Sequence, residues 1–220
     1  MAINPPDFVI AGSAKSGTTA LDLMLDQHES VYMSQIKETN YFVHGFEPTR
    51  HFVAHHGRSV LAGIDDIDII DDPQKYRGVF DAAPPGAVLG EASPWYLINR
   101  DVPDRLLRQR PDVKVVVILR NPTDVAFANF VHLVRVGGEC LALDQMDQIF
   151  EASHYEQPNL YPFSHHLNLP RYSVHLPVWV EKIPASQIHL MIYEEFRQDR
   201  AGALVKLLEV VGVPARVVGR

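Results

Sequence analysis

An apolar run at residues 113–119 constrains the fold of this chain more than any other feature. The stretch reads VKVVVIL and is apolar at every position except Lys114. A strand with one face in solvent alternates apolar and polar residues, whereas a strand buried on both faces of a parallel sheet is almost continuously apolar. The run therefore predicts an inner strand of a parallel sheet.

Strand-like and helix-like segments alternate along the rest of the chain. Besides this run, strands are expected over residues 7–13, 87–89 and 188–196. Apolar residues at helical spacing predict helices over residues 18–28, 101–110, 123–136, 171–183 and 201–213. This alternation predicts an α/β fold with a central, mostly parallel sheet, whose ligands bind at the carboxyl ends of the strands.

The composition fits an ordinary globular chain, with 46% hydrophobic and 21% charged residues, and we interpret residues 1–220 as one domain. A net charge of -7 argues against a nucleic-acid binder, which usually carries a basic face. Cys140 is the single cysteine, which rules out an intramolecular disulfide and suits a reducing compartment. The N-terminus lacks the pattern of a signal peptide, and no apolar run approaches the roughly 20 residues of a membrane span. We therefore expect a cytoplasmic protein without a transmembrane segment.

A glycine-rich turn follows the first expected strand, in the sequence FVIAGSAKSGTTAL. Such a turn points backbone N–H groups and the positive end of a helix at one place, which favours an anion. Either Thr18 or Thr19 is expected to cap the helix. Thr18 stands where an ATP-binding loop has its lysine, and Lys15 comes three residues earlier. The alternative is a tight turn with a solvated lysine.

Arg120 follows the run at residues 113–119, at the point where an ATP-hydrolysing loop protein usually has a magnesium-binding aspartate. Arginine binds no metal but pairs with phosphate, often through two hydrogen bonds. The alternative is a surface ion pair. Two anion sites on two strands of one sheet fit a ligand with separated phosphate-type groups.

Several motifs together resemble the sulfotransferases that use 3′-phosphoadenosine 5′-phosphosulfate (PAPS). They are AKSGTTAL, KETNYF, GEASPWYL, VVVILRNPTDVAFANF and PRYSVHLPVWVEKIPASQIHLMIYEEF. The resemblance covers residues 7–213, is weaker over 45–85 and 137–168, and is greatest to the bacterial and Golgi carbohydrate branch. It implies a three-layer sandwich of the P-loop-containing nucleotide hydrolase-like class. It also implies PAPS as donor, PAP as product, no metal, and a carbohydrate or small-molecule acceptor with a hydroxyl or amine.

The same resemblance assigns a role to each residue of the glycine-rich turn. Lys15 and the N–H groups of Ser16, Gly17, Thr18 and Thr19 would hold the 5′-phosphosulfate. Lys15 would stabilise the charge that develops on the leaving nucleotide, in the place of a metal ion.

Arg120 would bind the 3′-phosphate, and here the chain departs from the family pattern. Ala128 stands where the family has a second 3′-phosphate ligand, a serine, so one hydrogen bond of about 1–3 kcal/mol is missing. Asn129 is not expected to replace it, since a neighbour on a helix is displaced by roughly a quarter turn. Val125 stands where the family has a second arginine.

Glu38 in KETNYF would be the catalytic base that accepts the acceptor's proton. The alternative is a surface ion pair with Lys37. Glu91 is the second candidate base, and it is followed by Ala92 where the branch often has lysine, which disfavours a highly sulfated acceptor.

Two aromatic residues and two histidines have open roles. Trp95 and Tyr96 would line an acceptor site or belong to the core. His51 and His55 have a spacing compatible with a metal on a helix, but they lack acidic or cysteine partners, so no metal site is expected.

The resemblance leaves three functions open. A sulfotransferase is favoured over a nucleotide-binding module without catalysis, and a P-loop kinase is the least favoured. Family members usually continue past the position of residue 220 with a basic loop over the nucleotide, where this chain has only Arg216 and Arg220. We therefore expect a shortened member, a fragment, or a homo-oligomer in which another subunit completes the site.

Overall fold

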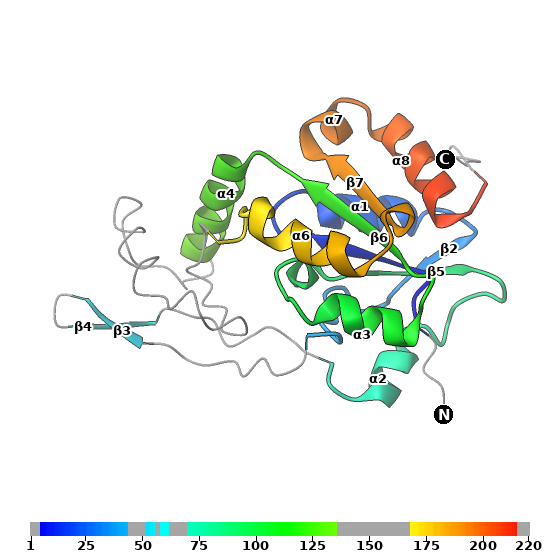
Figure 1. Cartoon of the computed structure of the whole chain (residues 1–220), viewed down its shortest axis with the longest axis horizontal. Helices are drawn as coiled ribbons and strands as arrows, with labels where there is room; N and C mark the ends of the chain where they lie inside the picture. Colours follow the sequence, from blue (N-terminus) through cyan, green and yellow to red (C-terminus); the bar gives the residue numbers. More distant parts are fainter. Residues whose placement is uncertain (1–4, 44–51, 56–57, 62–69, 136–167, 215–220) are drawn as a thin grey trace.

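The computed structural model describes most of the chain (Figure 1). The described residues are 5–43, 52–55, 58–61, 70–135 and 168–214.

One sheet forms the centre of the molecule. Its strands are β1 (Phe8–Gly12), β2 (Val31–Met33), β5 (Val88–Ala92), β6 (Lys114–Leu119) and β7 (Ile188–Ile192). The strand order is β2-β5-β1-β6-β7, and every pair is parallel. Because β1 lies in the middle and β6 beside it, the loop after β1 and Arg120 after β6 emerge at the same edge of the sheet.

Helices cover both faces of this sheet, as Figure 1 shows. They are α1 (Thr18–Leu25), α2 (Pro73–Gly78), α3 (Val102–Gln109), α4 (Pro122–Arg135), α6 (Tyr172–Lys182), α7 (Tyr193–Gln198) and α8 (Arg200–Val211). Short 3-10 helices follow β5 (η1, Pro94–Tyr96) and precede β7 (η3, Ala185–Gln187). A separate antiparallel pair consists of β3 (Phe52–His55) and β4 (Arg58–Leu61).

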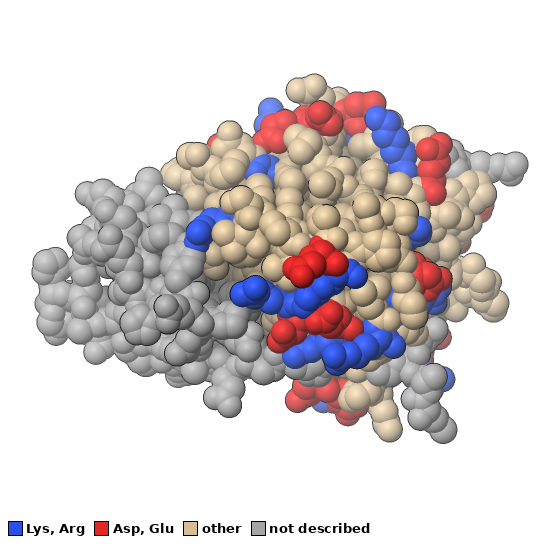
Figure 2. Space-filling view, in the orientation of Figure 1, with Lys and Arg blue, Asp and Glu red and all other residues tan. Residues whose placement is uncertain are grey.

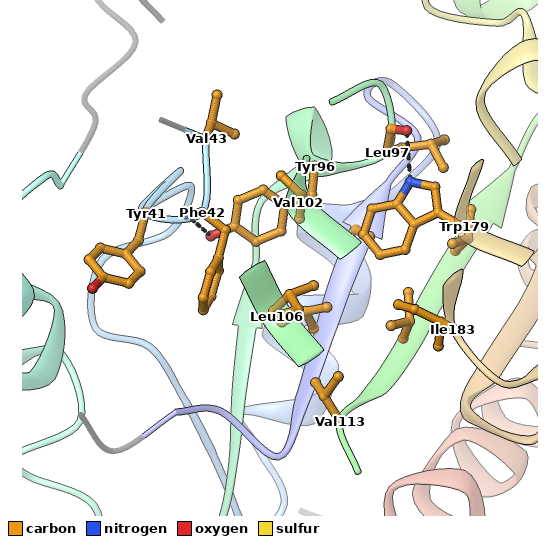
Figure 3. Close-up of a cluster of buried hydrophobic side chains, with 14 of the residues drawn as sticks. Tyr41, Phe42, Val43, Tyr96, Leu97, Val102, Leu106, Val113, Trp179 and Ile183 are labelled. Carbon is orange, nitrogen blue, oxygen red and sulfur yellow. Dashed lines mark hydrogen bonds between the residues drawn. The ribbon is translucent and has the colours of Figure 1, made fainter. Parts of the chain in front are cut away.

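Two buried cores lie on opposite faces of the sheet. One packs α2, α3 and α6 against alternate residues of β1 and β6, with Val9 and Val115 among them. The other packs α1, α7 and α8 against the intervening residues, such as Ile10 and Val116. In the first core the Trp179 indole donates a hydrogen bond to the Leu97 carbonyl at 2.9 Å (Figure 3). Since β1 and the central residues of β6, Val115–Ile118, are buried between helices on both faces, the predicted three-layer α/β sandwich is confirmed.

Several predicted boundaries were wrong. No side chain of the described residues caps α1: its N-cap is Gly17, in a left-handed conformation, and Thr18 is already helical. The strand expected over residues 87–89 continues to Ala92, which places Glu91 inside the sheet. The last strand ends at Ile192, because Tyr193 begins α7. His55 lies in β3, so it has no helical partner four residues away, and His51 lies outside the described residues.

Within the described part of the chain, no helix is long and apolar enough to cross a membrane.

Candidate active site

The loop between β1 and α1 is held against the neighbouring strand. The Ser13 N–H donates to the Ile118 carbonyl of β6 at 2.8 Å. Gly12 has a φ of 148°, and a Cβ there would lie 2.8 Å from Leu97 Cβ. Only glycine fits such a close approach of backbone to η1 and its C-cap.

Gly17 turns the loop into α1. Its φ is 89°, and a Cβ at this position would lie 3.0 Å from the ring of Tyr193. Helix N-termini leave their first N–H groups without intrahelical partners, and α1 has no side-chain cap from the described residues. Those groups, with the positive end of the helix, are directed at the space beyond the loop, which suits an anion.

Ser16, Thr18 and Thr19 differ in exposure. Ser16 and Thr18 are buried, and the Ser16 N–H donates to the Ser13 carbonyl at 3.3 Å, whereas Thr19 is exposed. The loop that sequence analysis identified is therefore a compact turn whose accessible polar groups are its helix end and Lys15.

Arg120 contacts this loop at the carboxyl edge of the sheet. Its Nη1 donates to the Lys15 carbonyl at 3.0 Å, and its Cζ lies 4.8 Å from the centre of the Tyr193 ring. Its Nη2 lies 3.7 Å from a carboxyl oxygen of Asp124, and its Nε is buried and has no hydrogen-bond partner among the described residues. Two residues 105 positions apart thus form one cationic site that keeps an unused donor.

A carboxyl group and a second cation accompany Lys15. Burial lowers the pKa of Lys15, the charge of Glu38 raises it, and that of Lys37 lowers it further. Glu38 and Lys37 form an ion pair, and the side chain of Glu38 is 41% exposed. The ion pair that sequence analysis offered as an alternative therefore exists, beside Lys15 and open to solvent.

The backbone around Glu38 is anchored to β5. Glu38 has a φ of 60° and Asn40 a φ of 49°, both in the left-handed region that few non-glycine residues adopt. The Glu38 N–H donates to the Ala92 carbonyl at 3.0 Å, and the Asn40 side-chain amide donates to the Glu38 carbonyl at 3.0 Å. These bonds hold an unusual loop that carries the carboxyl group.

His132 of α4 belongs to the same group of charges, and sequence analysis missed it. Burial lowers its pKa, the charge of Lys15 lowers it further, and that of Glu38 opposes both. Val125, Asn129 and His132 lie four and three residues apart, so they share one face of α4. The spacing of Val125, Asn129 and His132 in the helix after Arg120 is the sequence pattern from which His132 could have been predicted as a site residue.

Asn129 is buried, with 1% of its surface exposed, while Ala128 is half-buried. Asn129 therefore faces the interior, and the expectation that it does not replace the missing serine stays a prediction. The helix rotation that follows from packing Val125 decides this orientation, and that packing is not visible in the sequence.

Glu91 and Tyr96 have no exposed surface, so neither is part of an acceptor surface in this structure. The extension of β5 to Ala92 places the Glu91 side chain in the interior. Trp95 is half-buried and packs against Ala14, Ile98 and Val125, next to the glycine-rich loop. Of the three acceptor residues suggested by the sequence, Trp95 alone has both exposed surface and a place beside the site.

Among the described residues, no group of three or more His, Cys, Asp or Glu side chains is arranged to hold a metal. Cys140, Arg216 and Arg220 lie outside the described residues.

The geometry defines a class of protein: an α/β sandwich whose glycine-rich, P-loop-like turn and strand-end arginine lie together at the carboxyl edge of a parallel sheet. Residues 5–218 match the family model described as "Sulfotransferase domain". The chain therefore belongs to the PAPS-dependent sulfotransferase family, and the resemblance seen in its motifs is confirmed.

Three similar proteins illustrate this membership. The crystal structure of a sulfotransferase from Alicyclobacillus acidocaldarius has a TM-score of 0.83 and 26% identity, covering 99% of this chain and 85% of that one. The bifunctional heparan sulfate N-deacetylase/N-sulfotransferase 2 of Bos taurus is 28% identical over 94% of this chain. A mouse sulfotransferase, SULT7A1, crystallised with PAP, has a TM-score of 0.52 and 15% identity, covering 100% of this chain and 62% of that one, and shares the fold.

The chain spans only 22% of the bovine relative's length.

Proposed function

We propose that this chain transfers a sulfuryl group from PAPS to a hydroxyl or amine of a carbohydrate or small-molecule acceptor. The observation that carries the proposal is the hydrogen bond from Arg120 to the Lys15 carbonyl, which places the strand-end arginine against the glycine-rich loop. Family membership supports the donor, and the bovine relative, an N-sulfotransferase of heparan sulfate by name, supports a carbohydrate acceptor.

The residues present fit a nucleotide with two separated phosphate groups. The uncapped end of α1 offers N–H donors to one group. The unpartnered Nε of Arg120 offers a charged donor to the other, and an unmade buried hydrogen bond of this kind is costly until a ligand completes it. Lys15, Ser16, Gly17, Thr18 and Thr19 would hold the 5′-phosphosulfate. Arg120 would bind the 3′-phosphate, with Ala128 at the position of the missing serine.

PAPS, when bound, supplies an activated sulfuryl group and leaves as PAP. Lys15 stabilises negative charge on the departing phosphate, and its partial burial strengthens that interaction because less water screens it. Lysine performs this role without a metal ion.

Glu38 accepts the proton of the acceptor hydroxyl or amine. It lies within the field of Lys15, is accessible to solvent, and is held by a loop anchored at the end of β5. Glu91, the second candidate base, has no accessible surface, so the geometry favours Glu38. His132 lies near both charged groups and is a further residue of this site.

The test is turnover by a Glu38→Gln variant, beside a Glu29→Gln control on an exposed residue outside the site. We expect wild type and Glu29→Gln to release PAP from PAPS at equal rates in the presence of an amine or hydroxyl acceptor. Glu38→Gln should lose at least about 100-fold in kcat, the size of a general-base contribution, with unchanged PAP affinity. Equal turnover by Glu38→Gln would exclude Glu38 as the base, and PAP binding without any turnover would favour the non-catalytic module.

A further inference from the structure

A single buried carboxyl group collects four hydroxyl groups beneath the loop that carries Glu38. Ser93 Oγ and Tyr96 Oη donate to Glu91 Oε1 at 2.6 and 2.7 Å, and Thr39 Oγ1 donates to the same oxygen. Tyr76 Oη donates to the other oxygen, Oε2, at 2.7 Å. No part of Glu91 is exposed, so its carboxyl group depends on these donors in place of water.

Three of these hydroxyls also accept hydrogen bonds from consecutive backbone N–H groups of the loop. Asn40 N–H donates to Ser93 Oγ at 3.2 Å, and Tyr41 N–H donates to Thr39 Oγ1 at 3.4 Å. Phe42 N–H donates to Tyr96 Oη at 3.4 Å, a bond visible in Figure 3. Each of the three hydroxyls therefore links one backbone N–H group to Glu91 through two consecutive hydrogen bonds. We call these three links the hydroxyl relays.

The hydrogen bonds of the hydroxyl relays all point the same way, from the loop toward Glu91. A hydroxyl has one proton, and the carboxyl oxygens of Glu91 accept it from each of the four hydroxyls. Because each hydroxyl gives its proton to Glu91, its lone pairs remain to accept from the loop. Consecutive hydrogen bonds of this kind also polarise and strengthen one another.

These N–H groups directly follow the strained part of the loop. Positive φ values at Glu38 and Asn40 cost free energy and persist only where surrounding bonds enforce them. We propose that Glu91 is a positioning residue: through Thr39, Ser93 and Tyr96 it fixes the loop conformation that presents Glu38 beside Lys15. The proposal rests on the proposed function for its catalytic consequence, whereas its structural part is independent of it.

The arrangement predicts an asymmetry between substitutions of Glu91. Among the described residues, Tyr76 alone donates to Oε2, and its hydroxyl accepts from none of the N–H groups of residues 40–42. In Glu91→Gln the amide NH₂ can take the Oε2 position and donate to Tyr76, while the remaining oxygen, with two lone pairs, can accept from two of the other three hydroxyls. Glu91→Leu removes every acceptor and leaves the hydroxyls unpaired.

The experiment combines amide hydrogen exchange of residues 40–42 with kcat and PAP affinity. Thr39→Val and Tyr96→Phe each delete a hydroxyl that joins the loop to Glu91. Tyr76→Phe is the matched control, because it deletes a hydroxyl that donates to Glu91 but does not contact the loop N–H groups. We expect about tenfold or faster exchange and about tenfold lower kcat in the first two, with PAP affinity unchanged. Thr39→Ser should restore both. Tyr76→Phe should stay within about threefold of wild type in both readouts.

Three outcomes would overturn the inference. Loss of kcat in Glu91→Gln with unchanged exchange would make Glu91 the base itself. Unchanged exchange in Thr39→Val would show that the hydroxyls do not hold the loop, as would equal effects of Tyr96→Phe and Tyr76→Phe. If wild type had no turnover, the proposed function would fail, while the exchange data would still decide whether Glu91 orders the loop. Should Glu91→Leu not fold, the single-hydroxyl variants carry the test.

Discussion

Lys15 combines a left-handed backbone, with a φ of 60°, and a charge that burial destabilises. Neither property improves stability, and strained or poorly solvated residues concentrate at functional sites. The sequence predicted the importance of this lysine from its early position in the loop. It could not predict the environment, because Glu38 and Lys37 approach from a different segment of the chain.

The pH dependence of kcat/KM for PAPS should report this environment, since this quantity follows ionisation of the free enzyme. Lys15 must be protonated to stabilise the leaving group, and its pKa is lowered, mainly by burial. We therefore expect kcat/KM to fall as pH rises, beginning below the ordinary pKa of lysine. In Lys15→Arg the guanidinium stays charged, so the alkaline decrease should disappear. A decrease shared by both enzymes would belong to another group.

Asp22 of α1 provides a stability test beside the site. Burial raises its pKa to about 6, with Lys37 opposing and Asp26 and Glu38 adding to the increase. A raised folded pKa means that the protonated carboxyl favours folding, and this stabilisation is lost as pH rises from about 4 through about 6. Asp22→Asn should increase the free energy of unfolding by about 1 kcal/mol at pH 7, allowing for solvent screening. Urea denaturation should show little difference near pH 4, and an equal gain at both values would contradict the assignment.

At the scale of elements, the start of α1 depends on Gly17 more than on the threonines after it. Its φ of 89° costs a non-glycine residue about 1–2 kcal/mol, and a Cβ would press on Tyr193, the ring that supports Arg120. Gly17→Ala should therefore lower both the free energy of unfolding and the affinity for PAP. Gly86→Ala is the matched control, because its φ is 82° but nothing lies within 4 Å of the added Cβ. We expect a similar loss of stability there without loss of PAP affinity.

The elements that the sequence predicted well are those with a strong apolar period. The run at 113–119 became β6, an inner strand as its continuous apolar residues predicted, whereas its pairing with β1 is seen only in the structure. Predictions failed where two elements join without a turn signal, as at Ile192, where β7 passes directly into α7. They also failed for β2, whose three residues are too few to show a period.

At the scale of the whole molecule, the site depends on the order of strands in the sheet. The sequence showed two anion-binding candidates, and the resemblance to a family brought them together. Strand order β2-β5-β1-β6-β7 provides the physical reason, because β1 and β6 are neighbours. The role of Glu91 was not predictable, since its four hydroxyl partners come from α2, η1 and two loops that only the fold brings together.

The described surface mixes charges of both signs. Figure 2 shows acidic and basic side chains next to one another on one face of the molecule. Ion pairs among the described residues include Lys182–Asp104 and Arg105–Asp101. A cytoplasmic location and assembly into a homo-oligomer stay predictions from the sequence.

Because the ligand site joins loops from separate strands, a bound nucleotide should stabilise the whole fold. At a PAP concentration of about 100 times Kd, linkage adds about 2.7 kcal/mol to the free energy of unfolding. For a chain of this size we expect Tm to rise by about 5–10 °C. Differential scanning calorimetry with and without PAP measures this, and an unchanged Tm at saturation would contradict a site built across the sheet.

Isothermal titration with PAP tests most directly whether the glycine-rich loop and Arg120 form one nucleotide site. Without Mg²⁺, wild type should bind PAP at least about tenfold more tightly than adenosine 5′-phosphate, which lacks the 3′-phosphate. Arg120→Gln should lose this preference, while its affinity for adenosine 5′-phosphate stays the same. No heat with PAP, equal affinity of wild type for the two nucleotides, or tighter binding of ATP with Mg²⁺ would contradict the account.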